Sequence, residues 1–224
     1  MTQTAFLFDL DGTLVDSVYH HVMAWHQALH GEQIELPVWS IHKRIGMSDG
    51  LMIGELLRIA GKPSENELTE RLKAGHAKAY KDLSATVKPL PGAQALLAYL
   101  STERVPWAIA TSGDPDGALP KLTALGLDPN TIIMVTRDEA KLSKPDPDLF
   151  IQAAERLNVQ ISRTIVVGDS QWDMLAAARC GALGVGLLCG GNDADELQRS
   201  GASRIYGDPA TLLENVNELV PNVI

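Results

Sequence analysis

Over its C-terminal two thirds, the chain alternates short apolar segments with helical patterns, and this alternation limits the possible folds strongly. The apolar segments with strand character are 105–111, 131–136, 163–169 and 183–188. The helical patterns that alternate with them include 116–127, 146–159 and 171–182. Because parallel strands need helical crossovers, the alternation predicts an α/β fold in which helices cover both faces of a parallel sheet.

The segment between the first strand and residue 87 differs, because it contains no convincing strand pattern. Its helical patterns are 17–31, 49–61 and 65–80. Gly31 is expected to end the first of them. We therefore predict an α/β core formed by residues 1–16 and 88–224, with a helical cap domain of residues 17–87 inserted after the first strand.

Composition and charge exclude several classes of protein. The 224 residues are 45% apolar and carry a formal net charge of −9 without any run of Lys or Arg, so nucleic acid is not an expected partner. No apolar run approaches the roughly 20 residues that span a bilayer, and no signal-peptide pattern is present. Cys180 and Cys189 do not suggest a disulfide framework. A cytoplasmic protein, either a monomer or a weak dimer without a membrane partner, is expected.

Carboxylates follow two of the predicted strands. The first strand runs into Asp9 and Asp11, which lie two residues apart and can therefore face the same way. Asp169 follows a later strand, and Asp173 lies four residues beyond it. Because parallel α/β sheets bind ligands at the carboxyl ends of their strands, we expect these acids to converge. Unit charges about 4 Å apart repel by about 4 kcal/mol at an effective dielectric constant of about 20, so a bound cation is expected.

Three further polar residues are expected at the same edge of the sheet. Thr111 and Ser112 follow the strand at 105–111, and Lys144 stands just before a helix. Lys144 alone would be interpreted as a solvated surface lysine, and its place beside the acids favours a functional role. Asp146 and Asp193 also begin helices, where an N-cap is the favoured interpretation.

Four motifs in this order resemble the haloacid dehalogenase-like superfamily. They are DLDGTLVDS (9–17), IATSG (109–113), KPDP (144–147) and GDSQWD (168–173). The helical insertion after the first motif is similar to the α-helical cap of the branch that holds β-phosphoglucomutase and phosphoglycolate phosphatase. The resemblance covers nearly the whole chain and implies a Rossmann-like core.

The resemblance also implies roles for the acids. Asp9 would be a nucleophile that forms an aspartyl phosphate, and Asp11 would protonate the leaving alcohol and later deprotonate the attacking water. Mg²⁺ would be held by the carboxylates of Asp9 and Asp169, by the backbone carbonyl of Asp11, and by Asp173 through a water molecule.

The remaining motif residues would bind the phosphoryl group. Thr111, the backbone N–H of Ser112 and Lys144 would contact its oxygens and offset developing charge. Gly12 would let the backbone approach the phosphate closely.

The predicted cap offers weaker signals. The polar segment 42–50 is similar to a specificity loop, in which Lys43 and Arg44 would meet an anionic substrate unless they are solvated surface charges. His21 is expected on the substrate side of the first cap helix, with a helix-surface or core-edge position as the alternative. Trp25 is expected to pack between cap helices, and for Met47 and Trp172 the site entrance and plain packing both remain open.

These features predict a Mg²⁺-dependent phosphatase that acts on a small phosphorylated metabolite. A sugar-phosphate mutase similar to β-phosphoglucomutase is the main alternative, and it needs a second phosphate anchor where this chain has the negative Asp49. Dehalogenation is disfavoured because such enzymes lack the acid at the position of Asp11. A receiver-type signalling domain is disfavoured because it is about half as long and has no cap.

Overall fold

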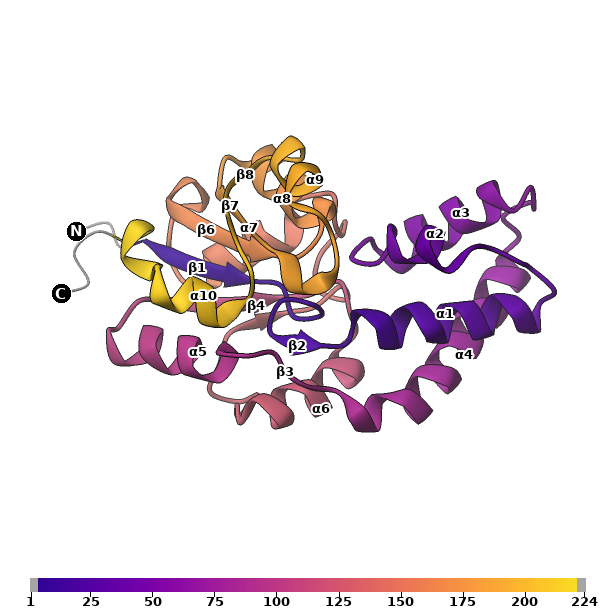
Figure 1. Cartoon of the computed structure of the whole chain (residues 1–224), viewed down its shortest axis with the longest axis horizontal. Helices are drawn as coiled ribbons and strands as arrows, with labels where there is room; N and C mark the ends of the chain where they lie inside the picture. Colours follow the sequence, from indigo (N-terminus) through magenta and orange to yellow (C-terminus); the bar gives the residue numbers. More distant parts are fainter. Residues whose placement is uncertain (1–3, 221–224) are drawn as a thin grey trace.

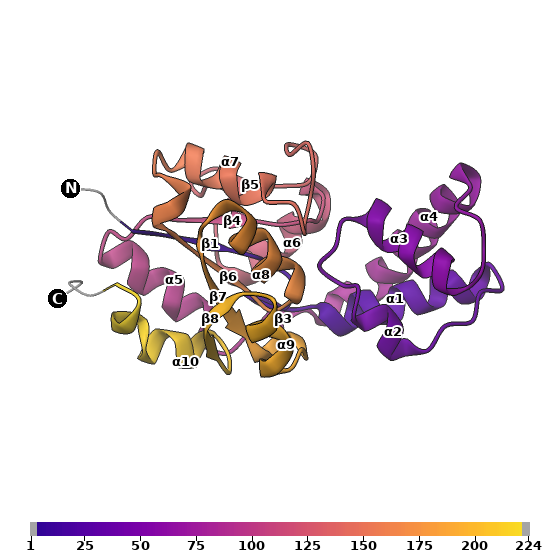
Figure 2. The same ribbon diagram turned by 90° about the horizontal axis from the view of Figure 1, so that it is seen from above.

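The computed structural model describes residues 4–220 and contains a six-stranded sheet in the order β5-β4-β1-β6-β7-β8, with every neighbouring pair parallel (Figures 1 and 2). The strands are β1 (Ala5–Phe8), β4 (Trp107–Ala110), β5 (Met134–Val135), β6 (Thr164–Gly168), β7 (Leu183–Leu187) and β8 (Ala202–Tyr206). Strands β4 and β5 lie on one side of β1, and strands β6, β7 and β8 lie on its other side. This arrangement confirms the predicted α/β class.

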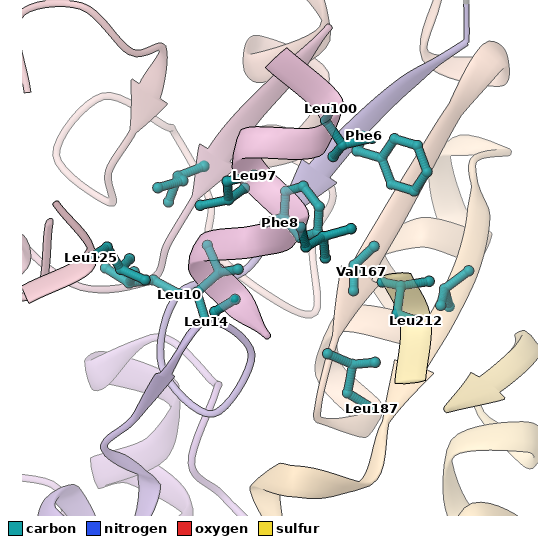
Figure 3. Packing of buried hydrophobic residues seen from close by; sticks show 14 of the residues in the cluster. Phe6, Phe8, Leu10, Leu14, Leu97, Leu100, Leu125, Val167, Leu187 and Leu212 are labelled. Carbon is teal, nitrogen blue, oxygen red and sulfur yellow. The ribbon is translucent and has the colours of Figure 1, made fainter. Parts of the chain in front are cut away.

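Helices cover both faces of the sheet, because its strands are apolar on both sides. The helices of the core are α5 (Ala93–Thr102), α6 (Pro115–Leu125), α7 (Asp148–Arg156), α8 (Gln171–Cys180), α9 (Ala194–Arg199) and α10 (Pro209–Glu214). Phe6 and Phe8 point to one face, where they form a buried cluster with residues of α5, α6 and α10 (Figure 3). Leu7 points to the other face and packs with residues of α7 and α8.

Four helices form a separate group beyond the carboxyl end of β1 (Figures 1 and 2). They are α1 (Val18–Gly31), α2 (Val38–His42), α3 (Asp49–Ile59) and α4 (Asn66–Leu83). Trp25, Leu29, Ile53 and Leu57 belong to the buried cluster that holds the group together. The chain enters and leaves the group through β2 (Val15–Asp16) and β3 (Lys88–Pro89), which pair antiparallel. Among residues 4–220, no helix combines the length and apolar character needed to cross a bilayer.

Several predicted boundaries differ from the structure. The strand predicted at 131–136 is reduced to the two residues of β5, and α2 has no counterpart among the predicted helices. Gly31 is the last residue of α1, but the left-handed turn after it falls on Gln33, which has φ 57°. The helix predicted at 146–159 runs only from Asp148 to Arg156, with Pro147 as its N-cap. Asp193 caps α9 as expected, by accepting a hydrogen bond from the Glu196 N–H.

Candidate active site

The carboxyl ends of the neighbouring strands β1 and β6 bring two of the predicted acids together, and the end of β4 lies beside them. Phe8, the last residue of β1, lies in register with Ile109 of β4 and Val167 of β6. Asp9 directly follows β1, and Asp169 directly follows β6. Because the strands are parallel neighbours, the two carboxylates emerge side by side at the edge that faces the cap helices.

A buried cluster of three carboxylates forms at this edge. Asp9, Asp169 and Asp173 each offer a carboxylate oxygen, and these atoms lie within 4.8 Å of one another. Lys144 is fully buried beside them, contacts Asp9, and places its Nζ 2.7 Å from Oδ1 of Asp173. One ammonium group thus faces three carboxylates, which leaves a buried excess of negative charge.

The protonation behaviour of the cluster reflects this excess. Burial raises the pKa of Asp9 to about 7, against the opposing effect of Lys144. Burial also raises the pKa of Asp169 well above its usual range, and the neighbouring Asp173 and Asp9 add to the shift. For Lys144, burial would lower the pKa, but Asp173 and Asp9 outweigh it and raise the pKa. The cluster of hard oxygen ligands with an uncompensated negative charge therefore fits Mg²⁺.

Local backbone structure fixes two members of the cluster. Asp173 is in the first turn of α8, where its Oδ2 accepts hydrogen bonds from the Ser170 N–H at 3.1 Å and from the Ser170 hydroxyl at 2.6 Å. Asp169 lies against Gly12, whose φ is +84°, and a Cβ at position 12 would stand 2.6 Å from the Asp169 carboxyl carbon. Position 12 therefore needs glycine because a larger residue would collide with Asp169. The predicted close approach of phosphate to this glycine is a separate expectation.

Asp11 does not join the cluster with its side chain. Its Oδ1 accepts hydrogen bonds from the Ser17 hydroxyl at 2.5 Å, from Lys121 Nζ at 2.5 Å and from His21 Nε2 at 3.3 Å. Burial would raise the pKa of Asp11, but Lys121 and His21 hold it well below its usual range. Asp11 is therefore a carboxylate in this arrangement, separate from Asp9 and surrounded by three donors.

His21 connects Asp11 to the cap helices. Its Nδ1 lies 3.1 Å from Nε2 of His76 on α4. Burial lowers the pKa of both histidines, that of His76 to about 3, so both rings are neutral. A carboxylate only accepts hydrogen bonds, so the contact with Asp11 requires the proton of His21 on Nε2, and Nδ1 then accepts from His76.

A cavity of about 400 Å³ lies between this edge of the sheet and the cap helices, within the size range of small-molecule sites. Asp9, Asp11, Asp169, Thr111 and Ser112 line its core side. Its cap side is lined by α1, α3, α4 and the segment before α3, through residues that include His21, Trp25, Met47, Asp49 and His76. Asp9, two of the predicted metal ligands, and Thr111 and Ser112 thus face one cavity, while Asp173 and Lys144 lie buried behind its wall.

Comparison with known proteins agrees with this geometry. A family model described as haloacid dehalogenase-like hydrolase matches residues 3–181. The chain belongs to the haloacid dehalogenase-like hydrolase family. It is 32% identical over 220 residues to a phosphoglycolate phosphatase of Neisseria meningitidis, covering 95% of this chain and 93% of that protein. It is 34% identical over 186 residues to hexitol phosphatase A of Escherichia coli, covering 80% and 82% of the two chains.

A solved structure extends the likeness to the fold. The crystal structure of a hydrolase from Pseudomonas syringae has a TM-score of 0.94 and 52% sequence identity, covering 96% of this chain and 99% of that one. The suspected membership of the haloacid dehalogenase-like superfamily is therefore confirmed. The roles of individual residues in this family member stay predictions.

The cap cations predicted to meet substrate lie elsewhere. Lys43 is paired with Glu196 of α9, so it joins the cap to the core. Arg44 does not line the cavity, because its guanidinium donates to the Ser40 carbonyl oxygen one turn earlier, at 2.7 Å. Ser112, in contrast, lies at the contact between the two parts, where its hydroxyl donates to the Gly46 carbonyl oxygen at 3.3 Å.

Two cations of the site were not predicted from the sequence. Lys121, which bonds Asp11, lies on α6 among the buried Ala118, Leu122 and Leu125. A lysine on the apolar face of a helix is the signal that could have identified it, because an unpaired buried ammonium is costly. Arg137 lines the cavity from the loop after β5, and no local pattern distinguishes it from a surface arginine.

Proposed function

We propose that this hydrolase of phosphoric monoesters acts on a small phosphorylated metabolite, requires Mg²⁺, and works through an aspartyl phosphate on Asp9. The observation that carries the proposal is the buried cluster of Asp9, Asp169, Asp173 and Lys144 at the end of the cavity. The names of the two phosphatase relatives support the reaction class. Asp11, held apart from this cluster, supplies a second carboxylate for proton transfer.

The first half of the reaction transfers the phosphoryl group to the protein. The Asp9 carboxylate attacks phosphorus, a P–O bond forms to Asp9, and the P–O bond to the alcohol breaks. Lys144, together with Thr111 and the Ser112 N–H, offsets negative charge on the phosphoryl oxygens. Asp9, Asp169, the Asp11 backbone carbonyl and, through a water, Asp173 would hold Mg²⁺, which would supply further positive charge to offset that of the phosphoryl group. The departing alcohol oxygen takes a proton from Asp11.

The second half returns Asp9 to its starting state. Asp11 accepts a proton from a water molecule, the water oxygen bonds to phosphorus, the P–O bond to Asp9 breaks, and inorganic phosphate leaves. The carboxylate form seen here, held by Lys121, His21 and Ser17, is the form this step needs. The acid step in the first half requires Asp11 to take up a proton and to exchange its bond with Lys121 for one with the leaving oxygen.

Phosphate release from a panel of small phosphate esters tests the proposal. With Mg²⁺ present, the full chain is expected to hydrolyse p-nitrophenyl phosphate and at least one metabolite ester, and a chelator is expected to stop this. Incubation with β-glucose 1-phosphate and a trace of bisphosphate separates the mutase alternative, since faster formation of glucose 6-phosphate than of free phosphate would contradict a phosphatase. The cytoplasmic location and the monomeric or weakly dimeric state stay predictions.

Mg²⁺ is expected to stabilise the folded chain more strongly at about pH 8 than at about pH 6. Asp9 has a pKa of about 7 without metal, so below that pH a proton must leave before its carboxylate can bind Mg²⁺. Asp169 also has a raised pKa and must lose its proton to bind metal, so the apparent affinity should fall by about tenfold or more for each pH unit below about 7. Thermal unfolding at increasing Mg²⁺ concentrations measures the stabilisation at each pH. Equal stabilisation at both pH values would contradict the metal site.

Replacing Asp11 with asparagine is expected to slow hydrolysis of alkyl phosphates by about 10²- to 10⁴-fold. The loss should be smaller for p-nitrophenyl phosphate, because nitrophenolate leaves without a proton. Asp16→Asn is the control, since Asp16 is an exposed acid at the end of β2. Steady-state kinetics with both ester types decides the matter, and equal losses for both would argue against an acid role of Asp11.

A further inference from the structure

The arginine that lines the cavity, Arg137, is held by carboxylates. Arg137 contacts Asp49 on α3 and donates to Asp114 Oδ2 at 3.1 Å, and its Nε lies 3.6 Å from Asp138. Asp49 and Asp114 line the cavity together with Arg137. The guanidinium group therefore already faces more negative charge than it carries.

The second cation of the cavity lining is also matched by a carboxylate. Lys73 of α4 donates to Glu70 at 2.8 Å, and both residues line the cavity. Two cations, Arg137 and Lys73, thus stand against three cavity carboxylates, Asp49, Asp114 and Glu70. Within the described part of the chain, the cavity lining outside Asp9, Asp11 and Asp169 therefore carries no excess positive charge for a second anionic group.

Several other residues of the lining suit an uncharged ligand. Met47, Met52 and Trp25 form an apolar wall, and the His76 ring stacks on Trp25 with 4.2 Å between centroids. His76 is neutral, since burial lowers its pKa to about 3. C–H groups can pack on such a wall while hydroxyl groups donate to the neighbouring carboxylates.

We propose that the substrate joins its phosphate to an uncharged, hydroxylated alcohol, of the polyol or sugar type, and that Asp49 sets this preference by occupying Arg137. The inference rests on the phosphatase function proposed above. A substrate with a carboxylate or second phosphate at its far end would meet Asp49, Asp114 and Glu70 and be repelled. Asp49 is thus a specificity residue, and its effect acts through the charge of Arg137.

Two matched pairs of esters isolate the charge. Glucitol 6-phosphate and 6-phosphogluconate differ only in a terminal hydroxymethyl or carboxylate group, and so do glycerol 3-phosphate and 3-phosphoglycerate. For the full chain with Mg²⁺, kcat/KM is expected to be higher for the neutral member of each pair that is turned over, by about tenfold or more. A preference for the acid member of either pair would overturn the proposal.

Asp49→Asn tests the assigned residue. Freeing Arg137 from one carboxylate is expected to lower the ratio of kcat/KM, neutral over acid, by about tenfold, mainly through KM for the acid. Asp82→Asn is the matched control, because it makes the same charge change at an exposed residue of the cap helix α4 that does not line the cavity and does not contact Arg137. An equal change of the ratio in both variants, or none in Asp49→Asn, would contradict the role of Asp49.

A reference substrate separates the two proposals. If p-nitrophenyl phosphate is hydrolysed but all four esters are refused, the substrate class is wrong and the phosphatase function stands. If p-nitrophenyl phosphate and the four esters are all untouched with Mg²⁺ present, the phosphatase function fails and the substrate class fails with it.

Discussion

Replacing Asp9 with asparagine is expected to abolish phosphate release, with a loss in kcat of about 10⁴-fold or more. The amide oxygen carries no negative charge, so it is a poor nucleophile toward phosphorus, and one ligand of the predicted Mg²⁺ site loses its charge as well. Asp9 lies at the end of β1 among the buried Asp169, Asp173 and Lys144, where neither acid is placed to replace it without moving the strand ends. Steady-state release of phosphate measures the loss.

The Asp9→Asn variant should remain folded, and this distinguishes lost chemistry from lost structure. Burial raises the pKa of Asp9 to about 7 in the folded chain, above its unfolded value. The unfolded chain loses the Asp9 proton near pH 4 and the folded chain only near pH 7, so the metal-free fold becomes less stable as pH rises between about 4 and 7. At about pH 8 without metal, thermal unfolding of the variant is expected at or above the wild-type temperature. A variant that is folded yet turns over at near the wild-type rate would refute the assignment of Asp9.

Replacing Lys144 with methionine is expected to lower both stability and activity. Lys144 is fully buried and contacts Asp9 and Asp173, so its removal leaves three buried carboxylates without a nearby cation. Breaking a buried ion pair in this way costs about 3–5 kcal/mol of unfolding free energy. Loss of the charge beside the phosphoryl oxygens should also lower kcat by about 10²-fold or more. Denaturant unfolding and steady-state kinetics measure the two effects.

The pH dependence of the Lys144→Met effect has a defined sign. The pKa of Lys144 is raised in the folded chain, so its stabilising charge is fully present throughout the range below its unfolded pKa. The carboxylates left behind have raised pKa values and ionise as pH rises, so the stability difference should grow from about pH 5 to about pH 8. Lys141→Met, at an exposed position in the same loop, should change stability by less than about 0.5 kcal/mol. A similar effect of both variants would contradict the role of Lys144.

The sequence predicted the acid cluster because it depends on local patterns that repeat at strand ends. Asp9 and Asp169 each follow an apolar segment, and parallel strands carry their carboxyl ends to the same edge. Lys144 was placed beside them through its motif, and the structure buries it between Asp9 and Asp173. The helical insertion was predicted because strand patterns are missing from 17–87, although its boundaries as a domain stay a prediction.

The contacts made between distant segments could not be predicted. Lys121 meets Asp11 across 110 positions, and Arg137 meets Asp49 across 88, so no spacing along the chain links them. The sequence shows only the negative charge of Asp49, and only the folded chain pairs it with a cation. The short helix α2 and the two-residue strand β5 are too brief for a periodic pattern, so packing against neighbouring elements decides them.

Trapping the covalent intermediate is the most direct test of the proposed mechanism. The full chain with Mg²⁺ and a rapidly hydrolysed ester would be quenched in acid during turnover, digested, and examined by peptide mass spectrometry. A peptide containing Asp9 is expected to gain the mass of one phosphoryl group on that residue, and the same peptide from Asp9→Asn should show no such gain. Phosphate released at the full rate while the label appears on another residue, or on none at any quench time, would contradict nucleophilic catalysis by Asp9.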